Sequence, residues 1–231
     1  MLDQILILDF GSQYTQLIAR KIRELGVYCE IHPCTSHWRG LVDEGTKGVV
    51  LSGGPSSVYE DEAPTVDPSL LAAPIPLLGI CYGMQLIAHL LGGRVGSVKK
   101  REFGRAELVV DDHSGLFENL DGRETVWMSH GDAIEAPPPG YRALAHSNGS
   151  RVAAMGSEDG LRYGIQFHPE VAHTPRGQEI LKNFLFGVCG CTGDWTMRAF
   201  IEESVERIRE RVGGERVVCG LSGGGDSSVA A

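Results

Sequence analysis

The sequence predicts an α/β protein built on an open, mostly parallel sheet with helices on both faces. Two observations predict this class. Apolar runs alternate with a helical pattern or long loops through the first ninety residues, and such connections join parallel strands. Short extended segments separated by Gly, Pro, Asn and Asp follow in the middle of the chain, and these predict antiparallel additions to the sheet.

The first half of the chain supplies the parallel strands. Apolar runs typical of buried strands lie at residues 4–10, 27–31, 48–51 and 76–80. Ser12 is a good helix cap, and apolar side chains at helical spacing predict a helix over residues 13–25. A second helix is predicted over residues 82–91, directly after the fourth strand.

The second half changes character twice. Shorter strands are predicted at residues 106–111, 124–128, 142–145, 152–156 and 161–167, and a closing helix over residues 178–186. A boundary near residues 187–194 separates a first domain, residues 1–190, from a segment comprising residues 191–231. That segment predicts a helix over about residues 195–212, a strand over residues 215–221 and a glycine loop. One strand and a partial helix cannot bury their own faces, so we expect a truncated second α/β domain.

Composition excludes several classes of protein. The 231 residues are 42% hydrophobic and 22% charged, which is typical of a globular chain long enough to bury a core. The net charge of −9 disfavours nucleic acid and anionic membranes as partners. No apolar run reaches the ~20 residues of a spanning helix, and no basic leader opens the chain. The six cysteines form no CxxC pair, so we expect free thiols, no bound metal and a cytoplasmic location.

A nucleophile motif lies at the end of the fourth strand. Gly79, Cys81 and Gly83 fit the pattern G-x-nucleophile-x-G at a strand-to-helix turn, where glycines relieve crowding around the nucleophile. The following helix places its positive end beside the sulfur and favours the thiolate. The Tyr82 amide can then point at a developing oxyanion. The alternative is a buried cysteine that acts as a small hydrophobe.

Two further motifs complete the candidate site. His168 and Glu170 are two apart at the end of a predicted strand, so both can face Cys81, with Glu170 orienting the imidazole. Alone, the pair could be an edge histidine beside a surface acid. Gly53 and Gly54 follow the third strand, where the Gly54 amide could complete an oxyanion hole with Tyr82. Alone, that segment could be a plain turn.

In their order and spacing, these three motifs resemble those of class I glutamine amidotransferases over residues 3–187. The resemblance implies a flavodoxin-like fold and glutamine as substrate. It implies that Cys81 attacks the carboxamide, His168 protonates the departing ammonia and water hydrolyses the thioester, without any cofactor. It also implies glutamine-binding roles for Gly53, Gln85, Ser129, His130 and Asp132. The alternatives are another class I amidotransferase or cysteine hydrolase on the same fold, or a non-catalytic module.

Further segments resemble the GMP synthetase family within that class. They are residues 9–20, 127–132 and the run Arg101-Glu102-Phe103-Gly104. Near the C-terminus, a run of glycines and serines resembles the pyrophosphate loop of N-type ATP pyrophosphatases; its residues are Ser222, Gly223, Gly224, Gly225, Asp226, Ser227 and Ser228. Asp226 stands where a Walker A loop needs lysine, and Gly225 stands where the resembled family usually has Val. A Gly/Ser linker is the alternative.

The resemblance implies a reaction for the complete enzyme. XMP, ATP, glutamine and water would give GMP, AMP, pyrophosphate and glutamate, with ATP and Mg²⁺ acting in the pyrophosphatase domain. The family implies a homodimer formed through a C-terminal region that is absent from this sequence. We therefore expect this chain to be a fragment that retains at most glutaminase activity.

Overall fold

Among the residues that the computed structural model describes (2–220, 222–225 and 228, without the side chains of 97–101 and 203), nine strands form one mixed sheet. Their spatial order is β2-β1-β3-β4-β9-β8-β7-β5-β6. In that order the strands are Tyr28–Pro33, Gln4–Asp9, Thr46–Leu51, Leu77–Ile80, Arg162–Ile165, Ala154–Ser157, Tyr141–Ser147, Arg94–Val110 and Arg123–Ala136. The chain divides into two units, Met1–Trp195 and Thr196–Ala231, and the sheet lies in the first.

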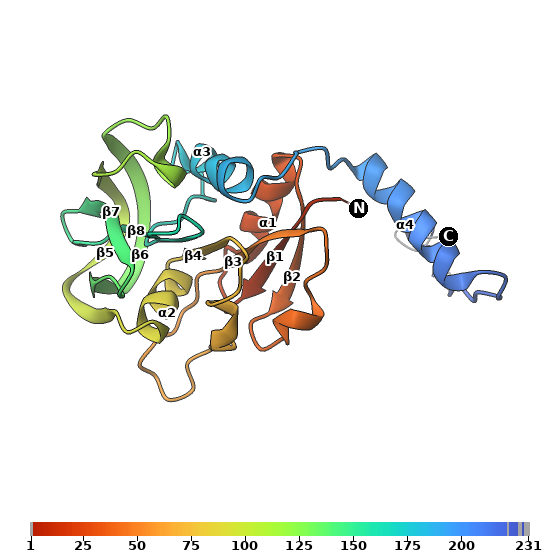
Figure 1. The fold of residues 1–231 in the computed structure, drawn as a ribbon, viewed down its shortest axis with the longest axis horizontal. Coiled ribbons are helices and arrows are strands. Elements are labelled where there is room, and N and C mark those ends of the chain that lie inside the picture. The colour runs from red at the N-terminus through yellow and green to blue at the C-terminus, as the bar shows by residue number, and fades with distance from the viewer. Residues whose placement is uncertain (1, 221, 226–227, 229–231) are drawn as a thin grey trace. The chain divides into compact units, whose positions relative to one another are not determined.

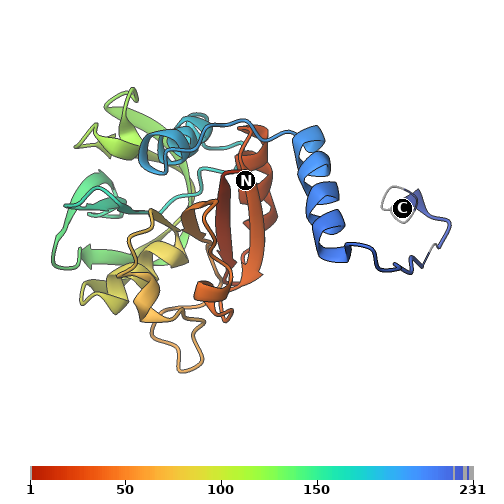
Figure 2. The ribbon, with the colours of Figure 1, turned by 45° about the vertical axis from the view of Figure 1, so that its right-hand side comes forward.

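Alternating side chains of the parallel strands enter two separate cores. Ile5 and Ile7 of β1 pack on one face with α1 (Thr15–Glu24), with α3 (Gly177–Lys182) and with the π-helical turn Asn183–Val188. Leu6 and Leu8 pack on the other face with α2 (Tyr82–Leu90). Figure 1 shows these helices beside the strands, and Figure 2 shows β1 and β2 next to each other. Burial on both faces explains why these strands read as continuous apolar runs.

The parallel part of the sheet extends further than we expected. The segment predicted at residues 161–167 forms β9, and β9 pairs in parallel with β4 although it is antiparallel to β8. This pairing places the ends of both strands at the same edge of the sheet, where Cys81 N–H donates to the Ile165 carbonyl at 2.8 Å. The residues after β4 and after β9 therefore meet.

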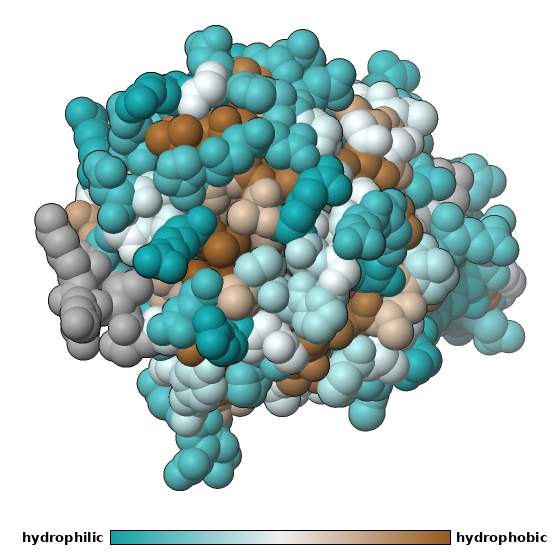
Figure 3. Space-filling model, turned by 60° about the vertical axis from the view of Figure 1, so that its left-hand side comes forward, coloured by the Kyte–Doolittle hydropathy of each residue, from teal (hydrophilic) through white to brown (hydrophobic). Residues whose placement is uncertain are grey.

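The helices and outer strands differ from the prediction in their limits. Ser12 Oγ accepts from the Tyr14 amide at 3.1 Å, so Ser12 forms a turn before α1, whose N-cap is Tyr14. The strands β5 and β6 are 17 and 14 residues long, because they pair with each other over nearly their whole length. By contrast, β5 pairs with β7 only at residues 108–110. The face drawn in Figure 3 carries small, scattered hydrophobic areas among hydrophilic residues.

The second unit contains α4, Met197–Val212, close to the helix expected at residues 195–212. The predicted strand over residues 215–221 is wrong for residues 215–220, which form no strand, and residue 221 lies outside the described residues. Val217 and Val218 are 67% and 96% exposed. An apolar run needs a neighbouring strand and a covering layer to become a buried strand, and the described part of this unit offers neither.

The two glycines of the nucleophile motif are required by close packing. A Cβ on Gly83 would lie 2.4 Å from the Leu51 carbonyl oxygen, and one on Gly79 would lie 2.6 Å from the Gly83 carbonyl carbon. These contacts hold the first turn of α2 against β3 and β4. No side chain fits there without moving backbone.

Gly83→Ala should therefore lower the free energy of unfolding by about 2–3 kcal/mol, because the added methyl group overpacks a site walled by backbone. Urea denaturation measures this. Gly122→Ala is the matched control, since nothing lies within 4 Å of a Cβ at that exposed position. Equal stabilities for the two variants would contradict the packing argument.

Candidate active site

Cys81 occupies the sharp turn between β4 and α2. Its φ of 51° and ψ of −105° form a conformation that non-glycine residues rarely adopt. This turn places the side chain at the N-terminus of α2, where the helix dipole favours a negative charge. The residue is 5% exposed, and its Sγ donates to the Ser129 carbonyl at 3.6 Å. The arrangement is that of a strained nucleophile turn.

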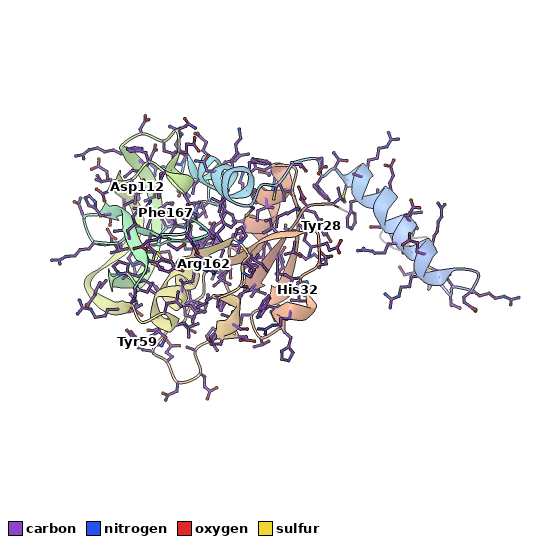
Figure 4. The ribbon with its side chains drawn as sticks, in the orientation of Figure 1. Tyr28, His32, Tyr59, Asp112, Arg162 and Phe167 are labelled. Carbon is purple, nitrogen blue, oxygen red and sulfur yellow. The ribbon has the colours of Figure 1, made fainter. Side chains whose placement is uncertain are left out.

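His168 and Glu170 form a buried pair beside it. His168 Nδ1 lies 2.7 Å from Glu170 Oε1, and the residues are 4% and 2% exposed. The segment is fixed by its backbone, because the His168 amide donates to the Trp127 carbonyl at 3.0 Å and the Thr174 hydroxyl to the His168 carbonyl at 2.7 Å. Figure 4 labels Phe167, whose buried ring precedes His168 in the chain.

The surroundings of His168 favour its charged form. Burial alone lowers its pKa, but hydrogen bonds and charge interactions with Cys81 and Glu170 outweigh burial and raise the pKa to about 10. Glu170 Oε2 has no hydrogen-bond partner among the described residues, so this carboxylate acts mainly on His168. The charges therefore suit a thiolate–imidazolium pair of Cys81 and His168.

The glycine segment after β3 closes over this pair. A Cβ on Gly53 would lie 3.3 Å from His168 Cε1, and one on Gly54 would lie 2.8 Å from the Phe10 carbonyl oxygen. The backbone bonds that hold the described elbow use the amides of Cys81 and Gly83, with Ile165 and Ser52 as acceptors. Of the two residues predicted to form the oxyanion hole, Gly54 lines both cavities beside Cys81, and Tyr82 follows Cys81 as the first residue of α2.

Two cavities meet at Cys81. The larger is about 400 Å³ and is lined on its polar side by Gln85, His130 and Asp132. The smaller is about 330 Å³ and is lined by Tyr14 and His168. Residues common to both are Gly54, Pro55, Cys81 and Ser129. The larger cavity can hold a molecule of amino-acid size with one end at the sulfur.

The loop at one wall of the larger cavity is held by several hydrogen bonds. Gln85 Nε2 donates to the Asp132 carbonyl at 2.8 Å, and Ser57 Oγ donates to Asp132 Oδ2 at 2.6 Å. His130 Nδ1 lies 2.9 Å from the same carbonyl, while its Nε2 lies 3.4 Å from Glu102 Oε2. Both ring nitrogens of His130 therefore face protein groups, whereas Asp132 and Ser57, which its carboxylate accepts from, both line the cavity.

The prediction missed two residues of this site. Gln166 is fully buried, and its Nε2 lies 3.5 Å from Cys81 Sγ. In an extended chain, residues two apart point to the same face, and Gln166 is two residues before His168. This spacing could have predicted that Gln166 belongs to the site. Glu102 accepts from the Ser147 hydroxyl, the Ser150 hydroxyl and the Gly149 amide at 3.0–3.1 Å. These partners lie far from Glu102 in the sequence, so their hydrogen bonds to Glu102 could not be predicted.

The predicted ATP loop lies in the second unit. Within it, the Ser222 hydroxyl accepts from the Gly224 amide at 3.3 Å, and the Ser228 amide donates to the Gly224 carbonyl at 3.2 Å. Gly223 has a φ of 80°. Gly225 precedes Asp226 and Ser227, which lie outside the described residues.

The described part of the chain contains neither a candidate metal centre nor a helix that could span a membrane. Within it, no group of three or more His, Cys, Asp or Glu side chains is arranged to hold a metal ion. Nor is any helix there long and apolar enough to cross a membrane. His32 is close in sequence to Cys34 and His37, but its Nε2 lies 3.1 Å from Glu30 Oε2, so the imidazole contacts a carboxylate of its own strand.

Comparisons with known proteins extend these observations. The model of the family "Glutamine amidotransferase class-I" matches residues 6–188. The chain is 53% identical to the GMP synthase [glutamine-hydrolyzing] of Heliobacterium modesticaldum and 54% identical to that of Geobacillus kaustophilus, covering 99% of this chain in each case. It spans only 45% of the length of either relative.

Solved structures agree with the fold. A protein of Thermoplasma acidophilum described as one subunit of GMP synthase has a TM-score of 0.73 at 32% identity, and the match covers 89% of this chain and 98% of that one. A glutamine amidotransferase of Thermotoga maritima, at 21% identity, has a TM-score of 0.64 with 82% and 99% coverage. The chain belongs to the class I glutamine amidotransferase family.

Proposed function

We propose that this chain hydrolyses glutamine to glutamate and ammonia, with Cys81 as nucleophile, and that it supplies ammonia for GMP synthesis. The observation that carries the proposal is the buried Cys81–His168–Glu170 set at the junction of two cavities. Its charges suit a cysteine nucleophile, and the larger cavity suits a substrate of amino-acid size.

The proposed reaction begins with the Cys81 thiolate, which attacks the side-chain carboxamide carbon of glutamine. The carbonyl oxygen gains negative charge, and the Gly54 and Tyr82 amides stabilise it. His168 gives its proton to the nitrogen, the C–N bond breaks and ammonia leaves a thioester. His168 then takes a proton from water, which attacks the thioester and releases glutamate and the thiolate. Glu170 stabilises the imidazolium throughout.

Substrate binding is assigned to the larger cavity. Its Asp132 carboxylate suits the positively charged α-amino group of glutamine, and Ser57 holds that carboxylate by a bond of 2.6 Å. Ser129 lies beside the sulfur and contributes its backbone to the wall. Gln85, His130 and Gly53 keep the wall in place through contacts with the protein. Among the predicted glutamine-binding residues, we therefore assign direct contacts to Asp132 and Ser129.

The complete reaction is proposed for a longer protein. The relatives named GMP synthase are about twice as long as this chain, and the match includes the segment from residue 196 onward. We infer that residues 191–231 begin an ATP pyrophosphatase domain, whose loop of Ser222–Ser228 would bind the phosphates of ATP with Mg²⁺. There, XMP would be adenylated and aminated by the ammonia.

Two properties of the complete protein are proposed with it. The absence of cysteine pairing supports a reducing, cytoplasmic location, since the described cysteines are all free. A homodimer would form through the part of the relatives that this chain does not span.

Cys81→Ala should lower glutamine hydrolysis by roughly 10⁴-fold or more, because Cys81 supplies the only thiol among the described residues that line the two cavities. The measurement is glutamate and ammonia release, with asparagine as a control substrate. Hydrolysis at the wild-type rate in this variant would exclude Cys81 as the nucleophile. If the wild type itself is inactive, adding the synthetase domain of a relative with ATP, Mg²⁺ and XMP tests whether that domain activates it.

Glu170→Gln should lower the pKa of His168 from about 10 towards its usual value of 6.5. The raised pKa stabilises the folded wild type fully below about pH 6.5, and this stabilisation is lost as the pH rises to about 10. The wild type should therefore lose its advantage in stability over the variant across this range.

Urea denaturation of both proteins at about pH 6, 8 and 10 measures that loss. Glu107→Gln is the control, because Glu107 forms an exposed ion pair with Arg123. If the difference in free energy of unfolding between the wild type and Glu170→Gln stays constant with pH, the assigned role of Glu170 is contradicted.

A further inference from the structure

We propose that Gln166 is a catalytic residue that stabilises the Cys81 thiolate by donating its side-chain N–H to the sulfur. The inference rests on the proposed function and adds a fourth residue to its machinery. Gln166 follows β9 and is 0% exposed, with its Nε2 3.5 Å from Cys81 Sγ. A fully buried amide that points at the nucleophile is a group the reaction scheme above does not use.

The orientation of this amide is fixed by its neighbours. The Asp132 carbonyl can only accept, so the Gln85 group 2.8 Å from it must be the NH₂ group. The same NH₂ group lies 3.2 Å from the side chain of Gln166, which must then present its oxygen to Gln85. The NH₂ group of Gln166 is left facing the sulfur. The Asp132 carbonyl therefore fixes the orientation of the Gln85 amide, and the Gln85 amide fixes that of Gln166. The Gln166 side chain then points an N–H at Cys81.

A thiolate at this position needs a second donor. The sulfur is withdrawn from solvent, and burial penalises an ionised group unless hydrogen bonds replace its water. His168 provides one partner from the segment after β9. Gln166 provides a neutral donor that keeps the same charge at every pH and stays in place after His168 has given up its proton.

Other titratable groups surround the sulfur and share its environment. Glu170 acts behind His168. From the loop after β3, Glu60 lines the larger cavity, and from β6, His130 and Asp132 line it too. Tyr14, the N-cap of α1, lines the smaller cavity. A change in the thiolate pKa must therefore be compared with a variant that leaves all of these groups in place.

Gln166→Met is that variant, since it keeps the length of the side chain and removes its hydrogen bonds. The test is the rate at which iodoacetamide alkylates Cys81 between about pH 5 and 10, followed by mass spectrometry of the Cys81 peptide. Losing one donor to a charged group should disfavour the thiolate, so alkylation on the acidic limb of the profile should slow about tenfold. Gln178→Met, on the exposed surface of α3, should leave the profile unchanged.

If the alkylation rate of Cys81 has the same midpoint against pH in a folded Gln166→Met protein as in the wild type, the proposal is overturned. If this variant does not fold, Gln166→Leu is measured in the same way. In the wild type, the side-chain amide signals of Gln166 in ¹⁵N NMR should shift with the same midpoint as alkylation, and their failure to shift would also overturn it. Alkylation needs no glutamine, so this outcome is independent of whether the chain hydrolyses glutamine.

Discussion

The parallel pairing of β4 with β9 is the constraint on which the site depends. It joins residues more than eighty positions apart, and the bond from the Cys81 amide to the Ile165 carbonyl fixes their register at the sheet edge. Three residues beyond Ile165, the chain reaches His168. A slip of one residue would turn Gln166 and His168 away from the sulfur. The position of Cys81 relative to Gln166 and His168 thus comes from backbone hydrogen bonds and not from the side chains themselves.

Burial then gives these side chains their chemistry. Glu170, His168 and Gln166 would each be ordinary polar groups in water, but here they are 4% exposed or less. In such surroundings, charge interactions are stronger than in water, so one carboxylate can hold an imidazole in its charged form. The cost is that each buried polar group needs its own partner. The network of Gln85, Asp132 and Gln166 meets that need for the Gln166 amide.

The sequence alone predicted the central strands and both elbow glycines, because burial on two faces and steric crowding leave clear local patterns. Period two also related His168 to Glu170. The direction of β9 could not be predicted, since one short strand pairs in parallel on one side and antiparallel on the other. Glu102 was hidden for a similar reason, as its partners at residues 147–150 come near only through the sheet. The strand prediction was wrong for residues 215–220, because an apolar composition cannot supply a neighbouring strand.

The position of Cys81 between two cavities has a consequence for inhibition. A glutamyl group attached to the sulfur would fill the larger cavity, while the smaller one would still open onto the other side of the thioester. Water and ammonia could then pass on that side without displacing the acyl group. A compound that occupies the smaller cavity would block that passage, and because the cavity is present before acylation as well, such a compound would inhibit non-competitively with respect to glutamine.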